Sequence, residues 1–163
     1  MILSNTFASF SLSEDSSKKL VEFFLDKDLP NFLSSKYIHL TIVESENIVN
    51  IPIDYFLGTL FAEHKHFSYG TFPSGETNQN TALVLVFNDK NIFDFQNKIT
   101  SFFDVPSVHP KFIPHITLSY NIPDDFDYEN LPLPDFDLIF DNFSGCEIPD
   151  ISNLEEELQK LFL

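Results

Sequence analysis

Basic side chains are scarce in this sequence, and arginine is absent. Nine lysines face 25 acidic residues, so the formal net charge at neutral pH is −16. Proteins that follow long DNA or RNA neutralise phosphates with lysine and arginine, so this balance argues against an enzyme that binds a nucleic-acid polymer. It leaves open a small nucleotide held in a local pocket, an acidic decoy for a nucleic-acid-binding protein, and a charged surface that only keeps the protein soluble.

Cysteine and long apolar runs are also nearly missing. Cys146 is the single cysteine, which excludes an internal disulfide and a metal site built from several cysteines, and fits a reducing cytosol. The first residues carry no basic stretch and are soon interrupted by Glu14 and Asp15, which argues against a secretory signal peptide. No apolar run is long enough to span a bilayer. We therefore expect a cytoplasmic protein without a membrane partner, and leave its oligomeric state open.

Hydrophobic residues make up 43% of the 163 residues, and 20 of them are phenylalanine, which is enough for a sizeable core. We expect one domain over residues 1–163, with two related lobes, because a helix precedes each of two similar strands. Alternating patterns predict strands at 6–12, 36–43, 81–87, 114–120, 136–142 and 144–148. Capping signals and helical spacing predict helices from Ser11 or Ser13 to about residue 28, at 91–103, and from Ser152. The polar stretch 44–50, the Gly- and Pro-bearing stretch 67–80 and the acidic stretch 121–135 are predicted to be loops.

Two of the predicted strands repeat one short pattern, a histidine two residues before a threonine. In a strand, alternate side chains share a face, so Tyr37, His39 and Thr41 are expected on one face of the first strand. His115 and Thr117 are expected together on one face of the second. The opposite face of each strand is apolar and would anchor it in the core. Two such strands can aim two imidazoles and two hydroxyls into one cleft, with Tyr37 beside them to touch a substrate.

This set of side chains suits the cleavage of a phosphodiester without a metal or other cofactor. A neutral histidine can accept a proton from the nucleophile while a protonated histidine donates one to the leaving oxygen. Imidazole is the side chain whose ordinary pKa allows both states near neutral pH. Threonine hydroxyls can hydrogen-bond the nonbridging oxygens and hold the phosphorus in line.

The remaining histidines lie in less informative surroundings. His66 also precedes a hydroxyl residue, Ser68, by two positions, but its neighbours are polar and no apolar face opposes it. We expect His64 and His66 to be exposed or loop residues. Their alternative role, as metal ligands together with Glu63, has poor spacing, and a structural role is expected for the fifth histidine, at position 109.

The paired motifs resemble the signature of the two-histidine (2H, or LigT-like) phosphoesterases, which carry one His-x-Thr/Ser motif on each of two related lobes. The resemblance spans most of the chain. It implies a bilobal α/β (α+β) fold with antiparallel sheets that line a concave central cleft, and a metal-independent phosphodiesterase. By this resemblance His39, Thr41, His115 and Thr117 are the catalytic residues.

The order of elements and the stretch 112–120 look most similar to the phage anti-CBASS nucleases, whose members degrade cyclic di- and trinucleotide signals of bacterial immunity in the host cytoplasm. That family closes an aromatic-bearing loop on a base and uses an acidic residue near its C-terminus. The resemblance implies that Phe72, with Tyr69 as second choice, supplies the aromatic ring and that Glu147 supplies the acid. Lys36 and Lys111 flank the two motif strands and are the best candidates for phosphate contacts.

Two other functions remain open at this stage. The first keeps the fold but changes the substrate, as a 2′,3′-cyclic phosphodiesterase that acts on RNA ends. The second is not enzymatic, and would be either a sponge that sequesters a nucleotide or an acidic inhibitor of a host protein.

Overall fold

The computed structural model of the protein describes residues 6–47, 49–74, 80–105 and 111–145. Within these ranges, seven strands form one antiparallel sheet in the order β3-β7-β1-β2-β6-β5-β4. In chain order the elements are β1 (Thr6–Leu12), α1 (Glu14–Phe24), the short 3₁₀ helix η1 (Ser35–Tyr37), β2 (His39–Ser45), β3 (Leu60–Ala62), the 3₁₀ helix η2 (His64–His66), β4 (Phe67–Ser74), β5 (Asn80–Phe87), α2 (Lys90–Phe102), β6 (His115–Ser119) and β7 (Leu138–Ser144).

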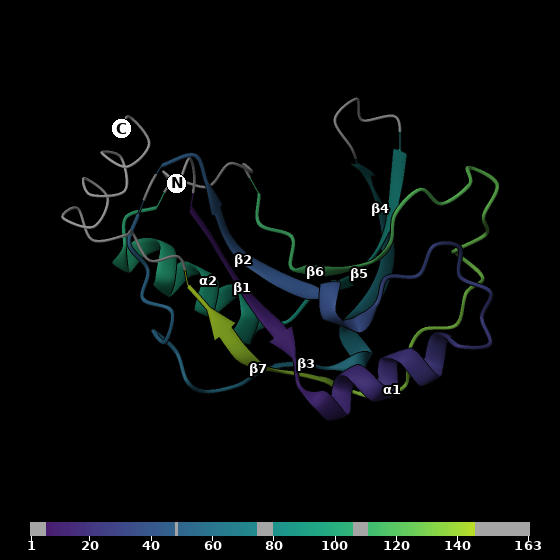
Figure 1. The fold of residues 1–163 in the computed structure, drawn as a ribbon, viewed down its shortest axis with the longest axis horizontal. Helices are drawn as coiled ribbons and strands as arrows, with labels where there is room; N and C mark the ends of the chain where they lie inside the picture. Colours follow the sequence, from purple (N-terminus) through teal and green to yellow (C-terminus); the bar gives the residue numbers. More distant parts are fainter. Residues whose placement is uncertain (1–5, 48, 75–79, 106–110, 146–163) are drawn as a thin grey trace, which may run out of the picture.

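The sheet is curled into an open half-barrel (Figure 1). Strands β4 and β5 rise on one side of the curl, strands β1 and β2 lie on the other, and α1 lies outside it. The predicted mixed α/β fold with antiparallel strands is therefore confirmed. Its two halves, β3-β7-β1-β2 and β6-β5-β4, are parts of one continuous sheet that meet where β2 pairs with β6.

One face of the sheet is covered by the helices and forms the core. Helix α1 buries Leu20 and Phe24 at a spacing of four residues, and α2 buries Ile92 and Ile99 at a spacing of seven, so each presents one apolar stripe to the sheet. The Ser13 hydroxyl caps α1, as predicted, by accepting a hydrogen bond from the backbone N–H three residues later at 3.1 Å. None of the helices in the described part of the chain is long and apolar enough to cross a membrane.

The structure corrects the prediction of a long exposed loop at 67–80. Strand β4 pairs with β5 along its whole length, from Phe67 opposite Phe87 onward. The glycine at position 70 and the proline at position 73 suggested a loop, but β4 is an edge strand, where proline is tolerated because its missing N–H can face away from the sheet. Residues 75–79 lie outside the described ranges.

The boundaries of several other elements also differ from those predicted from the sequence. Strand β2 begins at His39, after a turn of 3₁₀ helix, and continues to Ser45 because this end pairs with Thr6 of β1. Strand β7 begins two residues later than the strand predicted at 136–142 and runs through the predicted connection to Ser144. Most of the strand predicted at 144–148 lies outside the described residues. Helix α1 ends at Phe24 rather than near residue 28. The expected terminal helix from Ser152 lies outside the described residues.

Candidate active site

The two strands that carry the His-x-Thr pattern are neighbours at the centre of the sheet (Figure 1). They run antiparallel, with Leu40 of β2 paired with Ile116 of β6, and both of these side chains are fully buried. Ile42 and Leu118 extend the same buried face. The apolar faces predicted from the sequence thus anchor both strands in one core, and this fixes the direction in which the alternate residues point.

The antiparallel register brings the two patterns together crosswise. Leu40 opposite Ile116 is the pair that joins β2 to β6 in the described residues. Continued by one residue in each direction, this antiparallel register would set His39 across from Thr117 and Thr41 across from His115. The two His-x-Thr patterns therefore start from neighbouring strands on the face of the sheet opposite Leu40 and Ile116, and we call this region the patch.

Both histidine rings are oriented by the same local contact. The Nδ1 atom of His39 lies 3.0 Å from the backbone oxygen of Tyr37, and Nδ1 of His115 lies 2.7 Å from the backbone oxygen of Ile113. A carbonyl oxygen can only accept, so Nδ1–H is the donor in each case. This selects one tautomer for both neutral rings and leaves Nε2 as the nitrogen that gains or loses a proton.

An aromatic ring also contacts each histidine edge-on. Phe72 of β4 lies against His115 with ring centroids 4.9 Å apart, and Phe7 of β1 lies against His39 at 5.7 Å. Such T-shaped pairs are favourable beyond the area they bury, so both rings restrict the imidazole they touch. The sequence predicted a role for Phe72 but not for Phe7, although the alternation of β1 already placed Phe7 on the exposed face.

On the β1 side, hydroxyl groups border the patch. Ser9 opposes Thr41 and Ser11 opposes His39 in the register of β1 with β2. Ser11 is exposed and Ser9 is partly exposed, so this side of the patch is polar. Neither serine was predicted as a site residue.

On the β5 side, the border is apolar. Val86 opposes His115 and Val84 opposes Thr117 in the register of β5 with β6. Gly70 of β4 opposes Val84, and a Cβ atom at position 70 would lie 3.5 Å from a methyl group of Val86. Val86 is partly exposed, whereas Val84 is fully buried. The two borders of the patch thus differ: one offers hydrogen bonds, and the other is apolar.

Comparison with known proteins identifies the family of this chain. A family model described as anti-CBASS protein Acb1 matches residues 4–146. The chain belongs to the Acb1 family. No sequence match was found among curated proteins.

Solved structures show the same fold at low identity. A crystal structure of a phosphoesterase is 12% identical, with a TM-score of 0.58, and the match covers 85% of this chain and 84% of that one. E. coli LigT complexed with 3′-AMP is 12% identical, with a TM-score of 0.57 and 91% of each chain covered. E. coli LigT complexed with phosphate is 13% identical, with a TM-score of 0.55 and coverage of 84% and 82%. The Acb1-family chain therefore has the fold of the LigT-type phosphoesterases.

The other residues that the sequence suggested for this Acb1-family site are not all brought to the patch. Tyr37 is 59% exposed beside His39, with the Lys36 ammonium 4.9 Å from its ring centroid. Lys111 is exposed in the connection that leads to β6. Glu147 lies outside the described residues, as does the histidine at position 109.

Tyr69 is the residue that the structure does not bring to the patch. It alternates with Phe72 along β4, opposes buried Leu85, and packs against the core on the other face of the sheet. Its hydroxyl donates a hydrogen bond to the backbone oxygen of Pro132 at 2.8 Å, and burial raises the pKa of Tyr69 above its usual value. Phe72 is therefore the aromatic residue of this strand that contacts a motif histidine.

His64 and His66, the histidines outside the motifs that the structure describes, pair with aspartates instead. Nδ1 of His64 lies 2.7 Å from Asp137, and Nδ1 of His66 lies 2.9 Å from buried Asp89. The backbone N–H and then the ring of His64 hold the pKa of the Asp137 carboxyl below its usual value. Among the described residues, no group of three or more His, Cys, Asp or Glu side chains is placed to hold a metal ion.

Proposed function

We propose that this protein is a metal-independent phosphodiesterase that hydrolyses cyclic di- and trinucleotide immune signals and so evades CBASS defence in the bacterial cytoplasm. The observation that supports the proposal is the pairing of Leu40 with Ile116, which makes the two strands that carry the His-x-Thr patterns neighbours in one register. Membership of the anti-CBASS Acb1 family supports the biological role. The phosphate and 3′-AMP complexes of E. coli LigT support a phosphoester substrate for this fold.

In the proposed reaction, one neutral histidine takes the proton of the nucleophile, which is either the 2′-hydroxyl of the substrate or a water molecule, through Nε2. The nucleophile's oxygen bonds to phosphorus while the bond from phosphorus to the 5′-oxygen breaks, and the second, protonated histidine gives its Nε2 proton to that departing oxygen. The product is a linear oligonucleotide with a free 5′-hydroxyl. The exchange leaves one histidine protonated and one neutral, with their states reversed.

Thr41 and Thr117 would donate hydrogen bonds to the nonbridging oxygens. Continued by one residue from the Leu40–Ile116 pair, the register would set each threonine opposite the histidine of the other strand, so a phosphorus placed between the strands would have an imidazole and a hydroxyl on both sides. This placement can hold the nucleophile and the leaving oxygen in line. The Nδ1 contacts to backbone oxygens restrict the imidazoles before substrate binds, which reduces the ordering that the transition state requires.

The two borders of the patch suggest how a nucleotide lies on it. A base would rest on partly exposed Val86 and Gly70, against the ring of Phe72. Base–aromatic stacking contributes about 1–3 kcal/mol, which helps an acidic protein to hold an anionic ligand. The ribose and phosphate groups would face the serine border formed by Ser9 and Ser11.

The test is a set of 3′,3′-linked cyclic di- and trinucleotides together with mononucleoside 2′,3′-cyclic phosphates, incubated in excess EDTA and separated by chromatography. The wild-type protein is compared with the double variant His39→Ala/His115→Ala, which controls for a contaminating nuclease. We expect linear products from the cyclic oligonucleotides with the wild type and none with the double variant.

Other outcomes would replace the proposal. Cleavage of only the mononucleoside 2′,3′-cyclic phosphates would identify an enzyme that acts on RNA ends. Intact cyclic nucleotides that co-elute with both the wild type and the double variant would identify a sponge. If no nucleotide were cleaved or bound, the nucleotide function itself would be refuted.

A further inference from the structure

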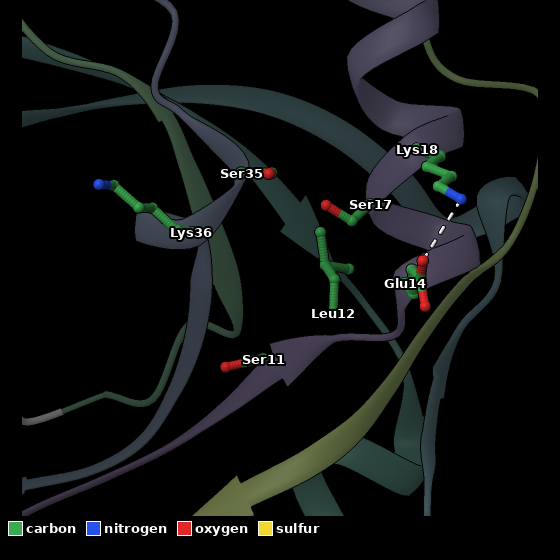
Figure 2. A pocket seen from close by; sticks show the side chains of 7 residues that line it. All are labelled: Ser11, Leu12, Glu14, Ser17, Lys18, Ser35 and Lys36. Carbon is green, nitrogen blue, oxygen red and sulfur yellow. Dashed lines mark ion pairs between the residues drawn. The ribbon is translucent and has the colours of Figure 1, made fainter.

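A second polar depression lies next to the His39 side of the patch, and the reaction described above does not use it (Figure 2). Its volume is about 430 Å³. It forms where the end of β1, the start of α1 and the turn η1 come together. The residues that line it and could contact a ligand through polar groups are Ser11, Glu14, Ser17, Lys18, Ser35 and Lys36.

This depression is continuous with the catalytic patch through Ser11. That serine opposes His39 across β1 and β2, and it also lines the depression. Ser35 and Lys36 belong to the turn that leads directly into β2, so they lie only a few residues before His39 in the chain. A ligand whose phosphorus lies between the histidines would therefore have its next group near this depression.

The chemistry of the depression suits an anionic, hydroxyl-bearing group. The hydroxyls of Ser17 and Ser35 point toward one another across it in Figure 2. Two of the nine lysines of this strongly acidic chain, Lys18 and Lys36, lie on its wall. Serine hydroxyls donate to phosphate oxygens, and lysine ammonium groups bind phosphate as point charges.

Both lysines can turn toward a ligand at little cost. Lys18 is paired with Glu14 at 3.3 Å, but these side chains are 70% and 87% exposed, and exposed pairs of this kind contribute little to stability. Lys36 extends away from the depression in Figure 2, with its ammonium over the ring of Tyr37. Its four-carbon side chain is flexible enough to swing toward a phosphate.

We propose that this depression, which we call the serine–lysine pocket, binds the non-scissile phosphate and adjoining ribose of a cyclic oligonucleotide. The proposal rests on the proposed function. It explains how so acidic a protein holds a substrate with two or three phosphates, because Lys18 and Lys36 can both turn to the second phosphate once Lys18 leaves Glu14 and Lys36 leaves the ring of Tyr37. It also predicts that the pocket distinguishes cyclic oligonucleotides from mononucleotides, because a mononucleotide has no second phosphate.

The test compares Lys18→Met with Lys19→Met in steady-state kinetics. The two lysines are consecutive on α1 and each forms an exposed pair with an acidic residue four positions earlier, but only Lys18 is among the residues that line the pocket. We expect Lys18→Met to raise KM for a cyclic dinucleotide about 5- to 10-fold, with kcat unchanged. The same variant should leave KM for a mononucleoside 2′,3′-cyclic phosphate unchanged, and Lys19→Met should match the wild type on both substrates.

A second pair of variants changes the charge in the other direction. Glu14→Gln removes the carboxylate that faces the pocket and releases Lys18, so it should lower KM for the cyclic dinucleotide. Asp15→Asn is the matched control, because it removes the same charge from the next residue of the same helical turn.

The outcomes distinguish a failure of the pocket proposal from a failure of the proposed function. If the wild type cleaves cyclic dinucleotides but Lys18→Met leaves KM unchanged, or raises KM for both substrates alike, the pocket proposal is refuted and the proposed function stands. If the wild type cleaves none of them, the proposed function fails first. Equal melting temperatures for all four variants show that any kinetic difference does not come from misfolding.

Discussion

Replacing Phe72 with leucine should slow cleavage by two amounts that can be measured separately. The first comes from the contact with His115, whose ring centroid lies 4.9 Å from that of Phe72. Edge-to-face pairs of this kind contribute about 0.5–1.5 kcal/mol, so losing the contact should lower kcat/KM about 2- to 12-fold for any substrate. The second comes from the base that we place on the ring, and its loss should cost a further 5- to 150-fold, or about 1–3 kcal/mol, for a nucleotide substrate.

The assay measures kcat/KM for two substrates, a cyclic dinucleotide and the base-free chromogenic diester bis(p-nitrophenyl) phosphate. Phe7→Leu is the control, because Phe7 makes the corresponding ring contact with His39 at 5.7 Å. We expect Phe72→Leu to show the small loss with the base-free diester and the larger, combined loss with the cyclic dinucleotide. Equal losses on both substrates would refute stacking of a base on Phe72, and no loss on either would refute both roles of the ring.

Three further predictions concern stability. Ile116→Ala should lower the free energy of unfolding by about 2–5 kcal/mol in urea titrations, because Ile116 is fully buried at the point where the two halves of the sheet meet; a loss under 1 kcal/mol would contradict this. Tyr69→Phe should reduce the loss of stability above about pH 10, because folding raises the pKa of Tyr69. The wild type keeps this contribution to stability below the pKa of the unfolded tyrosine and loses it as the pH rises from there toward the folded pKa. An unchanged alkaline limb in the pH dependence of unfolding would disprove the burial of that hydroxyl. Ser13→Ala should cost about 1 kcal/mol through loss of the α1 cap, and a melting temperature equal to that of the wild type would show that the cap contributes nothing.

The sequence predicted most helices and strands because their periodicity is local. The two motif strands were found because apolar residues such as Leu40 and Ile116 alternate with the polar histidines and threonines, and this alternation requires only that one face be buried. The same reasoning missed β4. Gly70 and Pro73 favour loops when they are considered alone, and their tolerance here depends on the place of β4 at the sheet edge, which is a property of the whole fold.

The candidate site, like the fold, could be predicted from the sequence only in part. The sequence could predict that His39 and Thr41 share a face, but not that Leu40 opposes Ile116, because strand order and register depend on pairing across distant residues. Phe7 was missed for that reason. The serine–lysine pocket could not have been predicted either, since its serines and lysines come from two separate stretches of the chain, 11–18 and 35–36.

The most direct test of the account is the cleavage rate of His39→Ala and His115→Ala, measured singly on one cyclic dinucleotide in excess EDTA. If the two histidines act as one acid–base pair, each variant alone should lose at least about 100-fold in rate, because general acid–base catalysis by one group contributes about 10²–10⁴-fold. The loss should persist with melting temperatures close to that of the wild type. If either single variant retained most of its turnover, the paired mechanism would be wrong.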